Sequence, residues 1–222
     1  MKELSIIIPS YNDEKNVKSL VKQIFKKKLS NSEIVIVESG KVGYRKEILK
    51  EVVFLKSGKG RALQMNTGAR KAKGKLLVFL HADSDISGID FSKFYKLTKE
   101  DEFGCFRIKF KSKKKYFRFV EITSNLRKKI FGIPFGDQGL IISRKLFNRV
   151  GGFSEGGFED IDMALHLMNV ANIKIINQYI KTSPRRFLEH GIVKTHLIMG
   201  LIFLSYSLGL KRVAFWFYGM IK

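Results

Sequence analysis

Five consecutive apolar residues, Leu76 to Leu80, run directly into the polar segment His81 to Asp85. An apolar run this short is typical of a strand buried on both faces, as in a parallel sheet. Side chains that follow such strands line the crevice where open α/β sheets bind ligands. Asp83 and Asp85 therefore have two interpretations. They are ligands of a hard divalent cation and the phosphates it bridges, or they cap the next turn.

Short apolar runs alternate along the chain with segments that have the hydrophobic period of a helix. The patterns predict strands at 4–8, 33–38, 52–55, 75–80, 103–110, 139–143 and 173–177. They predict helices at 13–25, capped by Asn12, and at 61–73, 116–129 and 159–170. Strands joined by helices of ten or more residues imply right-handed crossovers. The fold class is therefore α/β with a mostly parallel sheet.

The composition suits one domain, since 222 residues with 45% hydrophobic content can form a substantial core. The single cysteine, Cys105, lies in an apolar stretch and is expected to be a buried, inert thiol. The formal charge of +22 favours polyanions or anionic membrane surfaces. The lysines are widely spread, however, as on a solvated surface, so charge alone identifies no partner.

The chain changes character after about residue 190. Residues 197–210 are apolar and uncharged, and Lys211 and Arg212 separate them from a second apolar stretch that contains Trp216. Neither stretch reaches the roughly 18 to 20 residues that span a bilayer. The tail is either an interfacial helix on an anionic membrane or a helix packed on the domain. The start of the chain has no signal-peptide pattern, so we expect a cytoplasmic protein, with peripheral attachment to the inner face of the cell membrane if the tail is interfacial.

Four further segments carry polar residues at predicted strand or helix ends. The segments 9–12 (PSYN) and 38–40 (ESG) end the first two strands, at the same sheet edge as His81 to Asp85. The segment 60–70 (GRALQMNTGAR) offers cations and backbone amides at a helix start, which suit phosphates. The segment 136–139 (GDQG) precedes a strand. The segment 158–162 (FEDID) places carboxylates at a helix start, where they supply a base or stabilise the helix dipole.

Five motifs in this order resemble family 2 glycosyltransferases with the GT-A fold: IIIPSYN, IVIVESG, GRALQMNTGARKAKGKLLVFLHADSD, GDQGLIISRKLFNRVGGF and FEDIDMALHL. The resemblance covers residues 4–190 or so. It looks closest to a short bacterial subgroup with GRARQMNxGA and FLHADT motifs and a late ARRWE-like stretch, here residues 183–187 (SPRRF). It implies a mixed, mostly parallel sheet flanked by helices. Residues 1–190 would form the catalytic domain, and residues 191–222 an apolar and basic helical tail.

In GT-A enzymes an Asp-x-Asp motif holds a divalent metal, Mg²⁺ or Mn²⁺, at the diphosphate of the sugar nucleotide. Here His81 stands in place of the first carboxylate. The resemblance therefore assigns Asp83 as the metal ligand and Asp85 as a second ligand or a turn residue.

The resemblance also predicts the donor and its binding residues. The donor is a nucleotide-diphosphate sugar, and a UDP-sugar is expected because uridine is the commonest base in the family. Pro9 and Tyr11 would flank the nucleobase, with Glu38 in the position of a base-contacting aspartate. The other donor and acceptor residues are Arg61 and Asn66 near the phosphates, Asp137 and Gln138 in the sugar or acceptor pocket, and Arg185 and Arg186 at the diphosphate.

The pair Glu159-Asp160 matches the ED motif of the family, whose aspartate is the catalytic base of inverting members. We expect Asp160 to remove the proton of an acceptor hydroxyl as it attacks the anomeric carbon. Asp162 is the alternative base. The resemblance therefore predicts a hexosyltransferase-type enzyme with an unknown acceptor.

Other functions remain open at this point. A nucleotidyltransferase shares a sugar-nucleotide pocket, although the first strand is followed by PSYNDE rather than by a glycine-rich basic loop. A sugar-nucleotide-binding protein without activity is a second alternative, because of His81. A nucleic-acid binder is the third, but the chain has no recognised nucleic-acid motif and no basic-aromatic platform, so no nucleic-acid partner is expected.

Overall fold

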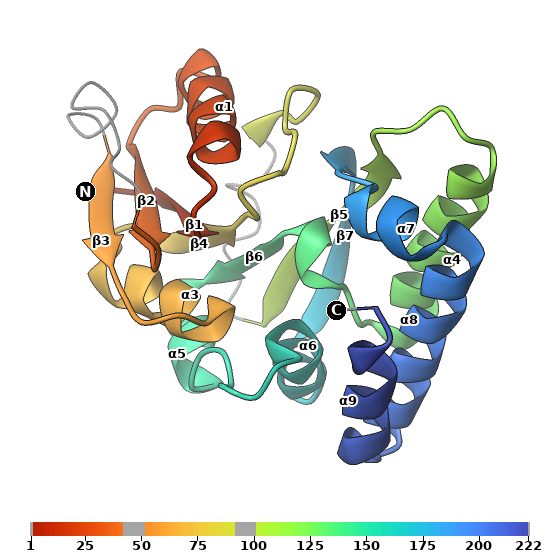
Figure 1. The fold of residues 1–222 in the computed structure, drawn as a ribbon. Helices are drawn as coiled ribbons and strands as arrows, with labels where there is room; N and C mark the ends of the chain where they lie inside the picture. The colour runs from red at the N-terminus through yellow and green to blue at the C-terminus, as the bar shows by residue number, and fades with distance from the viewer. Residues whose placement is uncertain (1, 42–51, 92–100, 222) are drawn as a thin grey trace. The chain divides into compact units, whose positions relative to one another are not determined.

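The computed structural model describes residues 2–41, 52–91 and 101–221, and its fold divides into two compact units (Figure 1). The first unit consists of Met1–Lys109 and Asn125–Thr182, and the second of Phe110–Ser124 and Ser183–Lys222. The second unit thus starts before residue 191 and includes an internal segment. The division into a 1–190 catalytic domain and a 191–222 tail stays a prediction.

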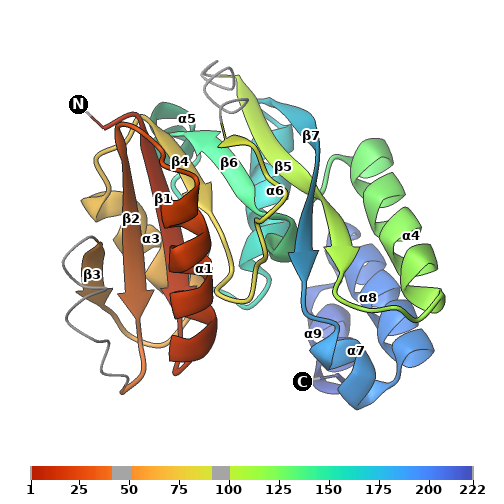
Figure 2. The same ribbon diagram turned by 90° about the horizontal axis from the view of Figure 1, so that it is seen from above.

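A seven-stranded sheet with the order β3-β2-β1-β4-β6-β5-β7 is the frame of the first unit (Figure 2). The strands are β1 Leu4–Ser10, β2 Ser32–Glu38, β3 Val53–Lys56, β4 Leu76–Phe79, β5 Glu102–Phe110, β6 Leu140–Ser143 and β7 Asn172–Thr182. The helical elements up to β7 are α1 Glu14–Lys26, α3 Arg61–Lys71, α4 Tyr116–Phe131, the 3₁₀ turn η2 Gly136–Gln138, α5 Arg144–Arg149 and α6 Glu159–Met168. The remaining helices, α7 Arg185–His190, α8 Ile192–Ser207 and α9 Lys211–Gly219, belong to the second unit.

The pairing of the strands confirms a mixed, mostly parallel sheet flanked by helices. Strand β1 runs parallel to β2 and β4, and β2 parallel to β3, whereas β6 is antiparallel to both β4 and β5. The register sets Ser10 opposite Glu38 and Ile7 opposite Phe79. The predicted common edge, where β1, β2 and β4 end, is therefore confirmed.

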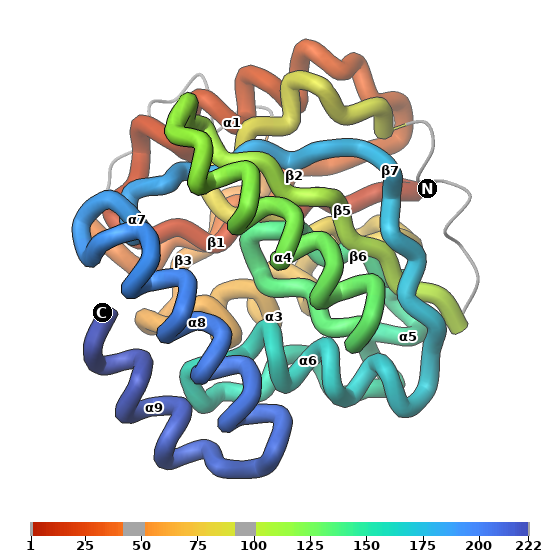
Figure 3. The backbone as a smooth tube through the Cα atoms, turned by 90° about the vertical axis from the view of Figure 1, so that its right-hand side faces the viewer, coloured from red at the N-terminus to blue at the C-terminus, as the bar shows by residue number. Residues whose placement is uncertain are grey.

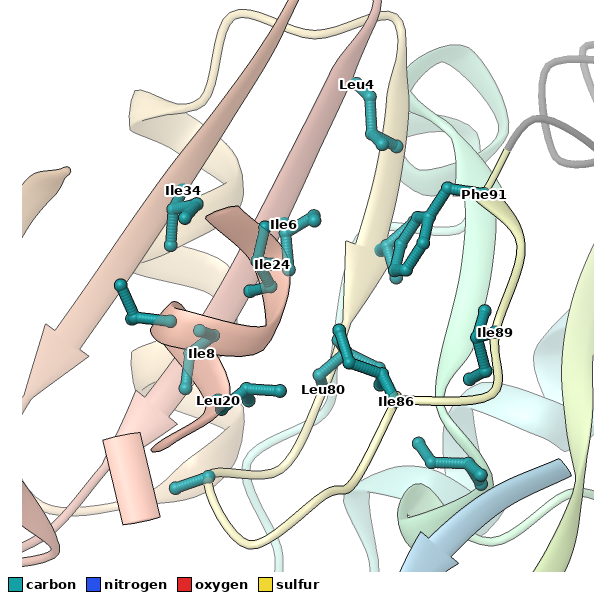
Figure 4. Packing of buried hydrophobic residues seen from close by; sticks show 14 of the residues in the cluster. Leu4, Ile6, Ile8, Leu20, Ile24, Ile34, Leu80, Ile86, Ile89 and Phe91 are labelled. Carbon is teal, nitrogen blue, oxygen red and sulfur yellow. The ribbon is translucent and has the colours of Figure 1, made fainter. Parts of the chain in front are cut away.

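Alternating side chains of the central strands pack into two cores, one on each face of the sheet. Ile6 and Ile8 belong to the core that includes Leu20 and Ile24 of α1 (Figure 4). Ile7, between them, belongs to the core that contains residues of α3, α5 and α6. Full burial of one such aliphatic side chain contributes about 1.5–3 kcal/mol. Burial on both faces explains why these strands are uninterrupted apolar runs.

Local details differ from the sequence prediction at three helices. Asp13, not Asn12, precedes α1 as its N-cap; Asn12 has φ 52° and its Oδ1 accepts a hydrogen bond from the N–H of Lys41 at 3.0 Å. Asn12 tolerates this left-handed backbone and stabilises a loop instead. Helix α3 ends at Lys71, two residues early, and α5 was not predicted. Its start is set by Ser143, whose Oγ accepts a hydrogen bond from the N–H of Leu146.

Helix α3 approaches the sheet closely at Gly68, which leads to a stability prediction. A Cβ atom at Gly68 would lie 2.5 Å from Cγ2 of Ile7 and 3.1 Å from Cγ2 of Val37. We expect Gly68→Ala to lower the free energy of unfolding by about 1–3 kcal/mol, because overpacking outweighs the better helix propensity of alanine. The urea midpoint measures the change.

The matched control is Gly200→Ala in α8, where a Cβ would meet no atom within 4 Å. At Gly200 only the better helix propensity of alanine matters, so we expect the free energy of unfolding to rise by up to about 1 kcal/mol. Equal effects at Gly68 and Gly200 would contradict the close packing of α3.

The second unit contains α7, α8 and α9 together with residues 110–124, and α8 packs along α9 (Figure 3). One face of α8 is buried through residues such as Ile198, Ile202 and Tyr206. Its opposite face exposes an apolar stripe, which comprises Val193, Leu197, Leu201, Leu204 and Leu208. Within the described residues, no helix combines the length and the apolar character that crossing a bilayer requires.

Candidate active site

Glu38 ends β2 as a fully buried carboxylate that organises the loops at the sheet edge. It accepts hydrogen bonds from Oγ of Ser10 at 2.7 Å, from the N–H of Asn12 at 3.0 Å and from the N–H of Gly40 at 2.6 Å. These bonds hold the segments after β1 and β2 against each other. The structure therefore gives Glu38 a structural role, and its predicted contact with a nucleobase stays a prediction.

Gln64 completes this edge and was not foreseen from the sequence. Its buried side chain donates hydrogen bonds to the carbonyls of Ser10 and Val37, at 2.5 and 2.8 Å. It lies one turn before Gly68 on the face of α3 that packs against the sheet. The available signal in the sequence was a polar residue, Gln64, on the otherwise apolar face of this helix.

The residues predicted to flank a nucleobase differ in exposure. Pro9 is buried within β1, whereas the ring of Tyr11 is half exposed and lies 4.5 Å from Nζ of Lys59. Of the two, Tyr11 is the exposed residue.

The starts of α3 and α6 are joined by an ion pair. Nε of Arg61 lies 2.6 Å from Oε1 of Glu159, which is almost completely buried. Burial raises the pKa of Glu159, and the Arg61 guanidinium opposes that shift. Neither helix is capped by the side chain of its N-cap residue, because these residues are Gly60 and Phe158.

Asn66 binds the backbone of Phe153 in both directions. Its Nδ2 donates to the carbonyl of Phe153 at 2.8 Å, and its Oδ1 accepts from the N–H of the same residue at 2.9 Å. Asn66 thus fixes the segment that leads to α6. Its predicted position near the phosphates stays a prediction.

Asp160 and His81 meet at Gly136, the first residue of η2. Oδ2 of Asp160 accepts a hydrogen bond from the N–H of Gly136 at 2.8 Å, and Oδ1 accepts from the N–H of Ile161 at 2.9 Å. A Cβ at Gly136 would lie 2.8 Å from Nε2 of His81 and 3.4 Å from Oδ2 of Asp160. The structure thus brings the predicted base next to the residue that replaces the first carboxylate of the Asp-x-Asp motif.

The two carboxylates after β4 have different surroundings. Oδ1 of Asp85 accepts a hydrogen bond from the N–H of Ser87 at 2.9 Å, and the backbone of Asp85 pairs with that of Lys181. This geometry matches the turn-capping interpretation of Asp85. Asp83 is partly exposed and lies close enough to Asp137 to raise the pKa of that residue.

The carboxylates at the sheet edge determine which divalent metal site the chain can form. Within residues 2–41, 52–91 and 101–221, no three Asp, Glu, His or Cys side chains converge on one point. Mg²⁺ and Mn²⁺ at phosphate sites need only one or two protein carboxylates, because phosphates and waters complete the shell. Asp83 fits a metal shared with a diphosphate, and the described residues do not form an all-protein cage.

Asp137 lies in a buried charge cluster with Arg127 and Lys128 of α4. Burial raises the pKa of Asp137 to about 6, and the Arg127 guanidinium opposes this shift. Burial lowers the pKa of Arg127 to about 10, and its guanidinium carbon lies 3.3 Å from the ring centroid of Phe135.

Lys128 is fully buried, and its Nζ donates a hydrogen bond to the carbonyl of Phe106. Burial lowers the pKa of Lys128 to about 8. The expected burial of Cys105 is confirmed, and this burial raises the pKa of its thiol to about 11. This cluster was not predicted from the sequence. The available signal was the position of Lys128, which follows the buried residues Phe117 and Val120 at spacings that place it on the same face of α4.

Two polar atoms of the GDQG segment are buried without a hydrogen bond. Within the part of the chain that is described, Oδ1 of Asp137 and Nε2 of Gln138 have no hydrogen-bond partner. Such atoms are uncommon in folded proteins and indicate a strained or functional position. Their predicted place in a sugar or acceptor pocket stays a prediction.

A small recess with a cavity volume of about 30 Å³ lies beside Asp160. His81, Glu159 and Asp160 are its polar side chains. Most of its wall is apolar, and its apolar side chains include Met65, Phe79, Phe103, Phe135, Phe153 and Met163. Asp162, the alternative base, is not among the described residues that line the recess.

Arg185 and Arg186 belong to α7 in the second unit. Arg185 lies 3.9 Å from Glu189, and Arg186 lies over the ring of Tyr218 at 5.7 Å. Their predicted contact with a diphosphate stays a prediction.

Open α/β sheets bind their ligands at the carboxyl ends of the strands, which is where the polar loops after β1, β2 and β4 gather here. The model of the family "Glycosyl transferase family 2" matches residues 5–154. The chain therefore belongs to glycosyltransferase family 2.

Relatives and solved structures agree with this assignment. The chain is 27% identical over 187 residues to an uncharacterized glycosyltransferase of Haemophilus influenzae, covering 74% of this chain and 62% of that protein. It is 28% identical over 107 residues to the uncharacterized glycosyltransferase EpsJ of Bacillus subtilis, covering 45% and 30%. The chain thus spans less than two thirds of these relatives.

A solved structure shares the fold: the mannosyltransferase PcManGT from Pyrobaculum calidifontis, in complex with GDP-Man and Mn²⁺. The TM-score is 0.63 at 17% identity, with 89% of this chain and 64% of that chain covered. This likeness confirms the predicted GT-A fold.

Proposed function

We propose that this protein transfers a sugar from a nucleotide-diphosphate sugar to an acceptor hydroxyl, with inversion at the anomeric carbon. The observation that carries the proposal is the position of Asp160. Its carboxylate accepts a hydrogen bond from the N–H of Gly136 at 2.8 Å, beside His81, in a chain that belongs to glycosyltransferase family 2.

The donor would lie along the ends of β1, β2 and β4. The exposed ring of Tyr11 is available to stack on the nucleobase, for which uridine is expected. The uncapped start of α3 and the half-exposed guanidinium of Arg61 suit the diphosphate, since helix N-termini and guanidinium groups both bind phosphate oxygens. Asp83 would hold a Mg²⁺ or Mn²⁺ ion, which neutralises charge on the leaving diphosphate when bound.

The chemistry is a single displacement. The carboxylate of Asp160 accepts the proton of the acceptor hydroxyl, while the acceptor oxygen forms a bond to the anomeric carbon. The bond between that carbon and the diphosphate oxygen breaks, and the nucleoside diphosphate leaves with the electron pair. Arg61 and the N–H groups of α3 stabilise the negative charge that develops on the leaving group.

Calorimetry with nucleoside diphosphates tests the donor site and the metal ligand together. We expect UDP or another nucleoside diphosphate to bind with Mn²⁺ present, and Asp83→Asn to weaken this binding at least tenfold. Without metal, the variant and the natural protein should bind alike, because Asp83 then has no cation to hold.

Asp85→Asn is the matched control, since its carboxylate is already used by the N–H of Ser87. A nucleoside diphosphate that binds equally well to Asp83→Asn with metal would show the ligand assignment to be wrong. No binding by any nucleoside diphosphate would overturn the proposed function. Binding without turnover would identify an inactive family member.

The second unit supports a further part of the proposal, peripheral attachment to an anionic membrane from the cytoplasmic side. Its two segments contain eleven Lys and Arg but only two Glu. The apolar stripe on α8 is exposed, and so is Trp216 of α9, 62% of whose surface is accessible. Exposed apolar side chains among basic residues are the signature of an interfacial helix.

Vesicle sedimentation tests the attachment. We expect binding to vesicles with anionic phosphatidylglycerol and little binding to phosphatidylcholine alone, with loss at high salt. Leu197→Glu with Leu204→Glu should reduce binding about tenfold or more, because both side chains belong to the apolar stripe. Met168→Glu with Val170→Glu, at exposed apolar positions of the first unit, is the control. Equal sedimentation of both pairs would contradict attachment through the stripe.

A further inference from the structure

The recess beside Asp160 has a wall that hydrocarbon fits better than a sugar. Five of its side chains, Met65, Phe79, Phe103, Phe153 and Met163, belong to the apolar core between the sheet and α3, α5 and α6. A small-molecule site normally combines such an apolar wall with a few polar groups that fix orientation.

The polar side chains of the recess are confined to one place. His81 and Asp160 flank Gly136, and Glu159 is the neighbour of Asp160 on α6. Glu159 is already paired with Arg61 at 2.6 Å. The polar side chains of the recess, which include the proposed base Asp160, therefore lie together at one end, and the rest of its wall is apolar.

A sugar acceptor would place several hydroxyl groups against this wall. Burying a hydroxyl without a hydrogen-bond partner is unfavourable, whereas burying a methylene group is favourable. The acceptor that suits this recess is a molecule with a single hydroxyl group at one end and a hydrocarbon chain attached to it.

We propose that the acceptor is a lipid alcohol, an aliphatic or isoprenoid primary alcohol whose hydroxyl meets Asp160 and whose first carbons enter the recess. This inference rests on the proposed function and names the substrate class of the same site. In the transfer, the alcohol loses its proton to Asp160, its oxygen bonds to the anomeric carbon, and the nucleoside diphosphate departs.

The second unit gives independent support. Alcohols of this class dissolve in bilayers, and the exposed apolar stripe with its surrounding basic residues suits attachment to a bilayer surface. An enzyme attached there meets a lipid alcohol at high local concentration.

Methionine methyl groups report occupation of the recess directly. Of the five methionines within the described residues, Met65 and Met163 line the recess, Met168 is exposed elsewhere in the first unit, and Met199 and Met220 belong to the second unit. With ¹³C-methyl methionine in the full chain, we expect geraniol and decan-1-ol to give saturable NMR shifts at Met65 and Met163. Methyl glucoside at the same concentration should give none.

Three outcomes would overturn the proposal: no shift at Met65 and Met163, equal shifts with methyl glucoside, or shifts confined to Met199 and Met220. The last would mean that the alcohol binds only on the apolar surface of the second unit. Because this experiment needs no donor, its result is separate from that of nucleotide calorimetry, which tests the proposed function.

Filling the recess supplies the matching activity test. Ala164 lines the recess from α6, and Leu140 lines it from β6, so Ala164→Phe and Leu140→Phe each introduce a ring from a different element. We expect geraniol to raise nucleoside diphosphate release at least tenfold over water in the natural protein. At least one folded variant should lose that stimulation and the methionine shifts, while it keeps its affinity for the nucleoside diphosphate. Unchanged stimulation in both folded variants would overturn the proposal.

Discussion

Replacing Asp160 by asparagine should lower the rate of sugar transfer about 10³-fold while the affinity for the nucleoside diphosphate stays the same. The amide oxygen of asparagine can still accept the hydrogen bond from the N–H of Gly136, so the local geometry is retained. The amide cannot accept the proton of the acceptor hydroxyl, and general-base catalysis contributes roughly 10²–10⁴ to a rate. Initial rates of nucleoside diphosphate release, with calorimetry for affinity, measure the two effects.

Asp162→Asn is the matched control for this experiment. It removes a carboxylate from the same helix, two residues further on, at a side chain that does not line the described recess. We expect Asp162→Asn to retain most of the transfer rate, once thermal unfolding has shown that the variant is folded. If Asp162→Asn abolished transfer and Asp160→Asn did not, the assignment of the base would be reversed.

The second large effect concerns stability. We expect Asp137→Asn to raise the free energy of unfolding at pH 7 by roughly 1–3 kcal/mol. Burial raises the pKa of Asp137 from 3.8 to about 6, so the ionised carboxylate destabilises the folded state by about 1.4 kcal/mol for each pKa unit. Asparagine has the same shape without the charge. Loss of a counter-charge for the buried Arg127 offsets part of the gain.

The pH dependence has a definite sign. Between about pH 4 and pH 6 the folded protein keeps a proton on Asp137 that the unfolded chain releases, so this group makes the free energy of unfolding fall as pH rises through that window. The benefit of Asp137→Asn should therefore be largest above pH 6 and vanish below pH 4. Denaturant titrations at several pH values measure it.

Asp101→Asn, at an exposed carboxylate, is the control and should change stability by less than about 0.5 kcal/mol. A loss of stability in Asp137→Asn at pH 7, or an unchanged slope between pH 4 and pH 6, would contradict the buried, destabilising carboxylate.

The frame of the fold was predictable because its physical signals are local. Short apolar runs such as Leu76 to Leu80 require burial on both faces, and the intervening helices fix the parallel order of β1, β2 and β4. The antiparallel placement of β6 between β4 and β5 was not predicted, because strand order depends on contacts distant in sequence.

The contacts of the candidate site residues could not be predicted from the sequence. The sequence order of the motifs predicted that Asp160 and Asp83 belong to one site, and the structure places the two residues around the GDQG segment. The order of the motifs could not show that Glu38 and Asn66 hold loops, or that Arg61 pairs with Glu159, since these contacts depend on tertiary distances. The buried Arg127 and Lys128 were missed for a related reason. Long basic side chains usually reach water, and only packing shows when they do not.

The central claim is that this site breaks the bond between a sugar and a nucleoside diphosphate. The most direct test is nucleoside diphosphate release from a panel of UDP- and GDP-sugars by the natural protein and by Asp160→Asn, with Mn²⁺ and with either geraniol or methyl glucoside as acceptor. The claim predicts release from at least one donor by the natural protein and a loss of about 10³-fold in Asp160→Asn. No release from any donor, or equal release by both proteins, would contradict it.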